Sequence, residues 1–260
     1  MRFTAYIDAL GFAAPGIADF GALGKRLQGG IWAAEPWEPA PGCLAPRQAK
    51  RLSPAIRLAL LVGEAVGPAL GEDAAWVFAS SVGEGETLNV ILSALCEPDM
   101  MIQPLRFQNA VHNAAAGQWS IAAGIKGPMT SIAAYDQTFG AGLLKALLQA
   151  RLEDRPVGLV LYDAPIPVPL DEKRPLGVPM GAALALSPRQ GASSRAVLKV
   201  EVTTGDATEP RSEAAKALSA TGNPVAAVLP LYEVIASRMS GSVMIAQHGG
   251  AALRCEVECL

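Results

Sequence analysis

The stretch GIKGPMTSIAAYDQTFGAGLLKALLQA, residues 124–150, decides the predicted fold. Residues 129–135 form a short apolar run with β-branched members, which is typical of a buried strand. From Thr138 onward, apolar residues recur at the spacing of a helix that buries one face. Asp136 and Thr138 are both favoured residues for a helix N-cap. The stretch therefore predicts a strand, a tight elbow and a helix.

An elbow of this kind directs one side chain and several backbone N–H groups toward a common point. Many α/β enzymes place a nucleophile there, because the helix N-terminus stabilises negative charge. In this chain the elbow carries Asp136 and Gln137, and neither Ser nor Cys lies among its residues.

The segment resembles the nucleophile elbow of the β-ketoacyl synthases, the condensing enzymes of fatty-acid and polyketide assembly. A gapless comparison beginning at Gly127-Pro128 places Asp136 where that family has its catalytic Cys, with Gln137 next to it. A slip of one residue would place Gln137 there but misplace the helix. Residues 113–128, NAAAGQWSIAAGIKGP, resemble the family's preceding buried helix, and residues 9–16, ALGFAAPG, resemble its opening. The match covers roughly the first two-thirds of the chain.

The resemblance implies an α/β, thiolase-like half fold with a C-terminal β-rich extension. Strand and helix patterns alternate along the chain, which favours a mixed, mostly parallel sheet with helices on both faces. We expect residues 1–165 to form a core like the N-terminal half of a ketosynthase. Residues 166–260 would form an extension packed on the same domain and ending in a β-hairpin around His248-Gly249-Gly250.

Expected elements follow from hydrophobic period and capping residues. Helices are expected at 54–70, 114–122, 138–150, 212–218 and 225–238. Strands are expected at 3–12, 74–80, 158–162, 180–186, 196–202, 242–247 and 251–258.

Composition excludes several classes of protein. The chain has 260 residues, of which 51% are hydrophobic, so it can bury a large core. Its net charge of -3 argues against a nucleic-acid surface. No apolar run reaches the length that spans a membrane, and the first residues read as a strand rather than a signal peptide, so we expect a cytoplasmic protein.

The cysteines do not indicate a metal site. Cys43, Cys96, Cys255 and Cys259 show no metal-ligand spacing, and we expect reduced thiols. We predict no metal and no cofactor. The loop SVGEGE, residues 81–86, lacks the Lys-Ser/Thr of a phosphate-binding loop and carries two Glu that would repel phosphate, so it is interpreted as a strand-to-helix turn.

The family's mechanism needs a thiolate to hold the acyl chain and two histidines to stabilise the developing enolate. This chain has only His112 and His248. His112 precedes the AAAG helix, in the wrong half, and His248 fits a hairpin turn in which Gly-Gly supplies positive φ. Asp136 fits an N-cap worth about 1 kcal/mol. We therefore assign no catalytic residue.

The resemblance implies the function of a chain-length factor, the non-catalytic homologue that pairs with a full-length ketosynthase. This chain is most similar to the short version found in aryl polyene biosynthesis. The implied heterodimer interface is the strand before the elbow: Thr130, Ser131, Ile132, Ala133 and Ala134. Phe107, Val111 and His112 would lie at the partner's acyl tunnel, whose length they would limit. The other implied partner is acyl carrier protein.

Two alternatives remain at this point. The first is a stand-alone enzyme on carrier-bound thioesters, a hydrolase or decarboxylase, that uses Asp136. The second is a homodimeric scaffold that recruits acyl carrier protein. Surface Arg and Lys would bind the acidic carrier, and the sequence shows no concentrated basic patch, which argues against this alternative.

Overall fold

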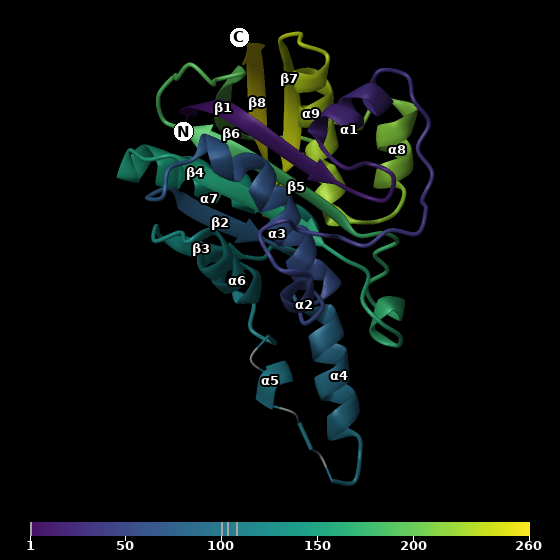
Figure 1. Ribbon diagram of the computed structural model, residues 1–260. Coiled ribbons are helices and arrows are strands. Elements are labelled where there is room, and N and C mark those ends of the chain that lie inside the picture. The colour runs from purple at the N-terminus through teal and green to yellow at the C-terminus, as the bar shows by residue number, and fades with distance from the viewer. Residues whose placement is uncertain (1, 100, 103, 108) are drawn as a thin grey trace.

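The computed structural model describes residues 2–99, 101–102, 104–107 and 109–260. A sheet of eight strands runs through the molecule in the order β3-β2-β4-β5-β1-β6-β8-β7 (Figure 1). The strands are β1 (Arg2–Ala13), β2 (Ala75–Ala79), β3 (Met129–Ile132), β4 (Val157–Asp163), β5 (Met180–Ser187), β6 (Ala196–Thr204), β7 (Gly241–Ala246) and β8 (Ala251–Cys259).

The sheet is mixed, as expected, but the expectation that it is mostly parallel is wrong. Among the described strands, parallel pairing involves β2 alone, with β3 on one side and β4 on the other. The remaining neighbours are antiparallel. For β4 and β5 the cause is the connection between them, which holds only a 3₁₀ turn, Leu170–Glu172. Without a crossover helix, β5 returns antiparallel beside β4.

Two copies of one strand pattern meet at the centre of the sheet. In the first copy β1 pairs antiparallel with β5, and β5 with β4. In the second, β6 pairs antiparallel with β8, and β8 with β7. A helix directly precedes the outer strand of each copy, α7 (Thr138–Glu153) before β4 and α9 (Leu229–Ala236) before β7. The first copy continues into β2 and β3, whereas the second ends at β7.

The predicted division at residue 165 falls inside this sheet. β5, which belongs to the second predicted segment, lies between β4 and β1 of the first. The terminal hairpin of β7 and β8 is present, and its turn has Gly249 and Gly250 at positive φ, as predicted.

The remaining helices are α1 (Phe20–Leu27), α2 (Pro46–Ala49), α3 (Pro54–Val66), α4 (Gly85–Leu95), α5 (Pro104–Phe107), α6 (Ala114–Ala123) and α8 (Glu213–Ser219). α3 and α6 bury one face of the sheet, with Trp76 and Trp119 in their core. α3 begins as predicted, because the Ser53 side chain accepts a hydrogen bond from the Ile56 N–H and Pro54 is the first helical residue.

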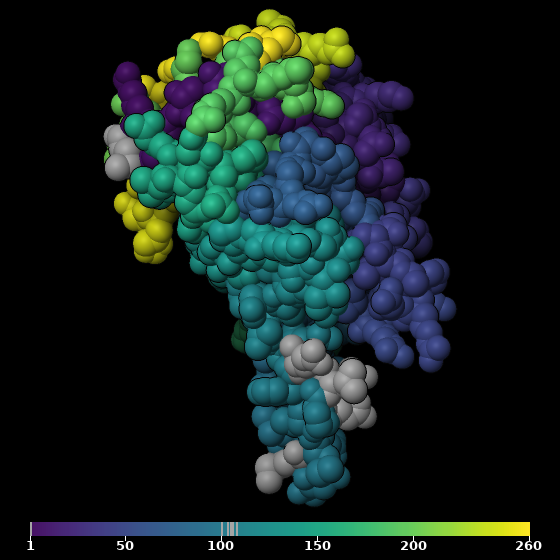
Figure 2. Space-filling view, turned by 60° about the vertical axis from the view of Figure 1, so that its left-hand side comes forward, coloured from purple at the N-terminus to yellow at the C-terminus, as the bar shows by residue number. Residues whose placement is uncertain are grey.

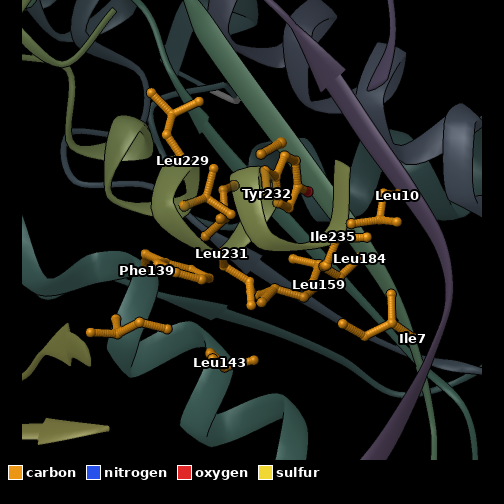
Figure 3. Packing of buried hydrophobic residues seen from close by; sticks show 14 of the residues in the cluster. Ile7, Leu10, Phe139, Leu143, Leu159, Leu184, Leu229, Leu231, Tyr232 and Ile235 are labelled. Atoms are coloured by element: carbon orange, nitrogen blue, oxygen red, sulfur yellow. The ribbon is translucent and has the colours of Figure 1, made fainter. Parts of the chain in front are cut away.

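The other face is covered by α1, α7, α8 and α9. Leu231 and Tyr232 from α9 gather with Phe139 from α7 above the strands (Figure 3). The Tyr232 hydroxyl donates to the Ala183 carbonyl oxygen at 2.8 Å, so the ring is buried without an unsatisfied polar group. Burial raises the pKa of Tyr232.

The outer face of β6 and β8 is polar. Lys199 pairs with Glu258 across the two strands, and Arg2 of β1 pairs with Glu201 at 3.2 Å. Alternating burial along β6 and β8 places these charged side chains in solvent and the apolar ones in the core. The second copy of the strand pattern is therefore covered by helices on one face only.

α4 projects from the body as an arm, with α5 beside it (Figures 1 and 2). Within the described residues, no helix is long and apolar enough to cross a bilayer.

Candidate functional site

The elbow between β3 and α7 is strained at one residue. β3 ends at Ile132, a 3₁₀ turn covers Tyr135–Gln137, and α7 begins at Thr138. Tyr135 has φ +52°, in the left-handed region that aromatic residues rarely adopt. The Thr138 hydroxyl holds the turn, because it accepts from the Ala134 N–H at 3.0 Å and donates to the Tyr135 carbonyl oxygen at 2.7 Å.

Asp136 does not cap the helix, so its interpretation as the N-cap is wrong. The N-cap residue is Gln137, which makes no side-chain cap hydrogen bond. The Asp136 carboxylate instead forms an ion pair with the Arg174 guanidinium at 2.7 Å. That guanidinium also lies over the Tyr135 ring, 3.7 Å from its centroid. Arg174 lies in the connection between β4 and β5, and it contacts both Tyr135 and Asp136 of the elbow.

This arrangement offers no activated nucleophile. The residues at the turn are a tyrosine, a carboxylate already bound to arginine, and a glutamine. A carboxylate cannot store an acyl group as a thioester, as a cysteine thiolate does. A cavity of about 280 Å³ opens beside the turn, and its lining includes Asp136, Gln137 and Asn223.

The two histidines belong to different parts of the structure. His248 is exposed in the turn between β7 and β8, where the prediction of a hairpin is confirmed. His112 is exposed near the arm and lies against Gly83 in the loop after β2. Among the described residues, no three His, Cys, Asp or Glu side chains are grouped so that they could hold a metal ion.

The strand before the elbow forms one edge of the sheet. β3 pairs with β2 and is the last strand in the order, so its other side meets no strand in the described part of the chain. Thr130, Ser131 and Ile132 are half-buried, Ala133 is exposed and Ala134 is half-buried. The opposite edge differs, because Thr208 covers β7. Its N–H donates to the Met244 carbonyl oxygen at 2.9 Å, and its hydroxyl accepts from the Met244 N–H at 2.8 Å.

The helix beside β3 has an outward face without charge. α6, with the sequence AAAGQWSIAA, contains no charged residue, yet it exposes Gly117 and leaves Ile121 80% exposed. A helix composed mainly of apolar residues is normally covered on most of its surface. A groove of about 300 Å³ runs between α6 and β3, and Ser131 and Met129 form part of its wall.

The arm also exposes apolar side chains. Leu88, Leu92 and Leu95 follow one face of α4 at helical spacing and are 45%, 41% and 47% exposed. Phe107, at the end of α5, is 62% exposed, and Val111 is 48% exposed. Exposed leucine side chains on α4 and an exposed phenylalanine on the neighbouring α5 are typical of an interaction surface.

The base of the arm is held by buried carboxylates. Asp163, at the end of β4, accepts hydrogen bonds from the Ser80 hydroxyl at 2.8 Å and from the N–H groups of Ser81 and Val82 at 3.0 and 3.3 Å. Glu84 accepts from the Ser53 hydroxyl. Burial raises the pKa of Asp163 and of Glu84, and this cause outweighs the hydrogen bonds that lower them. The loop of residues 81–86 is a strand-to-helix turn, as predicted.

A group of three basic residues that the sequence interpretation did not single out lies on α2 and directly after it. Arg47, Lys50 and Arg51 are spaced at i, i+3 and i+4 and are all exposed. Sequence reasoning also missed Arg174 and Asp163, whose roles depend on contacts between segments distant along the chain.

Residues 25–240 match the model of the β-ketoacyl synthase N-terminal domain. No curated protein matches the chain. Among solved structures, it is similar to a ketosynthase (ApeO) in complex with its chain length factor (ApeC) from Xenorhabdus doucetiae, with 22% identity, TM-score 0.74, and 97% of this chain and 99% of that chain covered. It is also similar to the ishigamide ketosynthase/chain length factor, with 13% identity, TM-score 0.73, and 99% of both chains covered.

A third similar structure is a type II polyketide synthase acyl-carrier protein in complex with its ketosynthase, AntDE:AntF, with 12% identity, TM-score 0.74 and full coverage of both chains. At these identities the neighbours establish the thiolase-like fold. The family model spans most of the sequence, and this chain therefore belongs to the β-ketoacyl synthase family through its N-terminal domain.

Proposed function

We propose that the chain is a non-catalytic, chain-length-factor-like partner of a β-ketoacyl-ACP synthase. The observation that carries the proposal is the elbow, which retains its strand, strained turn and helix but holds an Asp136–Arg174 ion pair instead of a nucleophile. The pathway we favour is a polyketide or fatty-acid type of chain assembly, of the aryl polyene class. The partner supplies the cysteine and the histidines.

The open edge of β3 supports a dimer built by extension of the sheet. Free backbone groups along an edge strand invite pairing with another chain, and proteins usually cover such edges. Here β7 is covered by Thr208, whereas β3 is open and lies beside the uncharged face of α6. A partner strand on β3 would cover both features, and its contacts would include residues 130–134.

The arm supports the second part of the proposal. Phe107, at the end of α5, and Val111, in the segment between α5 and α6, are exposed, as are the leucines of α4. In the heterodimer we place these side chains at the far end of the partner's acyl tunnel, where the bulk of Phe107 limits the length of the growing chain. His112 would flank the same end.

Arg47, Lys50 and Arg51 support recruitment of an acidic carrier protein. The three side chains are exposed in a chain whose net charge is -3, so they form a local positive surface on a negative protein. We propose that this surface assists the approach of acyl carrier protein to the heterodimer, in an interaction that weakens as salt concentration rises.

The test is co-expression with a ketosynthase that has its Cys and two His. We expect a 1:1 complex in size-exclusion chromatography with light scattering, and condensation activity only from the complex. Phe107→Ala should shift the product to longer chains, measured by mass spectrometry. Leu152→Ala removes a similarly exposed side chain from α7 and should leave product length unchanged.

Three results would contradict the proposal. They are turnover by the purified chain alone that Asp136→Asn abolishes, a stable homodimer that excludes the ketosynthase, and a complex whose product length does not respond to Phe107→Ala. The first would favour the stand-alone enzyme, and the second would favour the homodimeric scaffold.

A further inference from the structure

α4 has too little buried surface to fix its own direction. Of its residues only Gly85 and Ile91 are buried, and the element against which it packs most is the short helix α5. The leucine side chains on its exposed face do not pack into the hydrophobic core. The direction in which the arm leaves the body must therefore be set at its base, in the loop after β2.

The loop folds around a single carboxylate. Asp163 Oδ1 accepts from the Ser80 hydroxyl, the Ser81 N–H and the Val82 N–H. The Ser80 hydroxyl oxygen in turn accepts from the Gly83 N–H at 2.7 Å, and Gly83 has φ +67°. One buried oxygen atom thus binds the N–H groups of Ser81 and Val82 directly and is linked to the Gly83 N–H through the Ser80 hydroxyl. Asp163 is only 2% exposed, so water does not replace these bonds.

Two further contacts fix the first turn of α4. Gly85 lies so close to Ile166 that a Cβ on this glycine would be only 1.9 Å from the isoleucine Cγ2. Glu84 accepts from the hydroxyl of Ser53, the residue that caps α3. The base of the arm is therefore tied to the end of β4, to the segment after it and to the start of α3.

We propose that Asp163 is a positioning residue that sets the orientation of α4 and thereby the fit of the arm to its partner. The part concerning orientation stands on the geometry of the described residues, whereas the part concerning the partner rests on the proposed function. α4 has 11 residues, so it is about 16 Å long, and a rotation of about 10° at its base moves its tip by about 3 Å. A displacement of that size removes side chains from a packed interface.

The orientation is measured on the full chain by electron–electron distance spectroscopy. One spin label is attached to the exposed Cys96, directly after α4, and the other to a cysteine introduced by Glu72→Cys on the body. Cys43→Ser and Cys259→Ser remove the half-buried thiols. We expect one narrow distance distribution for the otherwise unchanged chain. Asp163→Ala should broaden it, or shift it by about 3 Å or more, and should weaken ketosynthase binding at least tenfold.

The conservative variant separates positioning from loss of fold. Asp163→Asn retains Oδ1, so both its distance distribution and its partner affinity should stay close to those of the parent chain. Should Asp163→Ala not fold, Ser80→Ala replaces it, because it removes the hydroxyl that links Asp163 to Gly83. The near-ultraviolet circular dichroism of the body serves as the check on folding.

An unchanged distance distribution in the folded Asp163→Ala or Ser80→Ala chain would overturn the role in orientation. A changed distribution with unchanged partner affinity would overturn the role in binding. Failure of the parent chain to bind any ketosynthase would instead count against the proposed function, and the distance measurement needs no partner and distinguishes the two cases.

Discussion

Gly158 shows how closely single residues in this fold depend on one another. It lies in the buried strand β4 beside the indole of Trp76, and a Cβ on Gly158 would be 2.5 Å from Trp76 Cε3. We expect Gly158→Ala to lower the free energy of unfolding by about 1–3 kcal/mol, the usual cost of overpacking a core. Chemical denaturation measures the change.

The matched control is Gly71→Ala, because nothing lies within 4 Å of a Cβ built there. Its effect should stay within about 0.5 kcal/mol. Equal stability of the two variants would mean that Trp76 moves aside without cost, contrary to the packing seen on this face of the sheet.

The cysteines differ in reactivity because they differ in environment. Burial, with a smaller contribution from Glu64, raises the pKa of Cys43 to about 12, and burial raises that of Cys255 to about 12. Cys96 is exposed. Because the thiolate is the nucleophile and the raised pKa leaves few Cys43 side chains ionised, we expect iodoacetamide at pH 8 to alkylate Cys96 before Cys43. Peptide mass spectrometry over time measures the rates, and equal rates at Cys43 and Cys96 would contradict the assignment.

The elbow also shows the limit of local reasoning at the scale of residues. Capping rules apply within a few residues, and they suggested that Asp136 caps α7. The carboxylate pairs with Arg174 instead, from a connection that folds back over the elbow. Nothing in the residues next to Asp136 signals this contact. Ser53 and Pro54, by contrast, start their own helix through contacts within its first turn, and this role was predicted correctly.

At the scale of elements, hydrophobic period identified most strands and helices, because each buries one or both faces locally. The apolar runs that became β2, β4 and β5 are buried at every position. The hydrophobic pattern does not predict whether each of these strands runs parallel or antiparallel to its neighbours. An apolar run is equally compatible with parallel and antiparallel neighbours, and the direction of β5 depends on the connection before it.

The edge strand β3 gives a test of the interface at this scale. The Trp76 N–H donates to the Pro128 carbonyl oxygen, and the Ser80 N–H donates to the Ile132 carbonyl oxygen. The backbone groups of alternate residues in a strand point to opposite sides, so the N–H and C=O of Ser131 point toward the open edge of the sheet. Ser131→Pro removes an outward N–H and leaves the bonds to β2 intact. We expect it to weaken ketosynthase binding at least tenfold.

Ser131→Ala is the control for the lost hydroxyl and should bind as the parent does. Isothermal titration or pull-down with the ketosynthase provides the comparison, and circular dichroism checks that both variants fold. Full affinity in the Ser131→Pro variant would exclude pairing of strands at β3.

At the scale of the whole molecule, the repeated strand pattern was invisible in the sequence, where no internal repeat can be recognised. The two copies share strand directions and the helix before the outer strand, but not residues. Topology is retained by many sequences with the same burial pattern, so comparison of residues cannot detect it. In the second copy, the outer face of β6 and β8 carries charged side chains, which suits a face that is exposed to water.

The cover on β7 can be removed by one substitution. Thr208→Pro deletes the N–H that donates to Met244 and the hydroxyl that accepts from it. We expect the variant to self-associate at tens of micromolar, because the second edge becomes free for pairing. Thr208→Ser keeps both groups and should behave as the parent. Sedimentation velocity measures the association, and a monomeric Thr208→Pro chain would show that other features protect this edge.

The unequal edges of the sheet also determine how large an assembly can become. In the part of the chain that the structure describes, the β3 edge meets no further strand, whereas the β7 edge is covered at Met244 by Thr208. If the proposed pairing at β3 forms, growth by strand addition ends with the pair, because the covered edge at β7 offers the next molecule fewer free backbone groups.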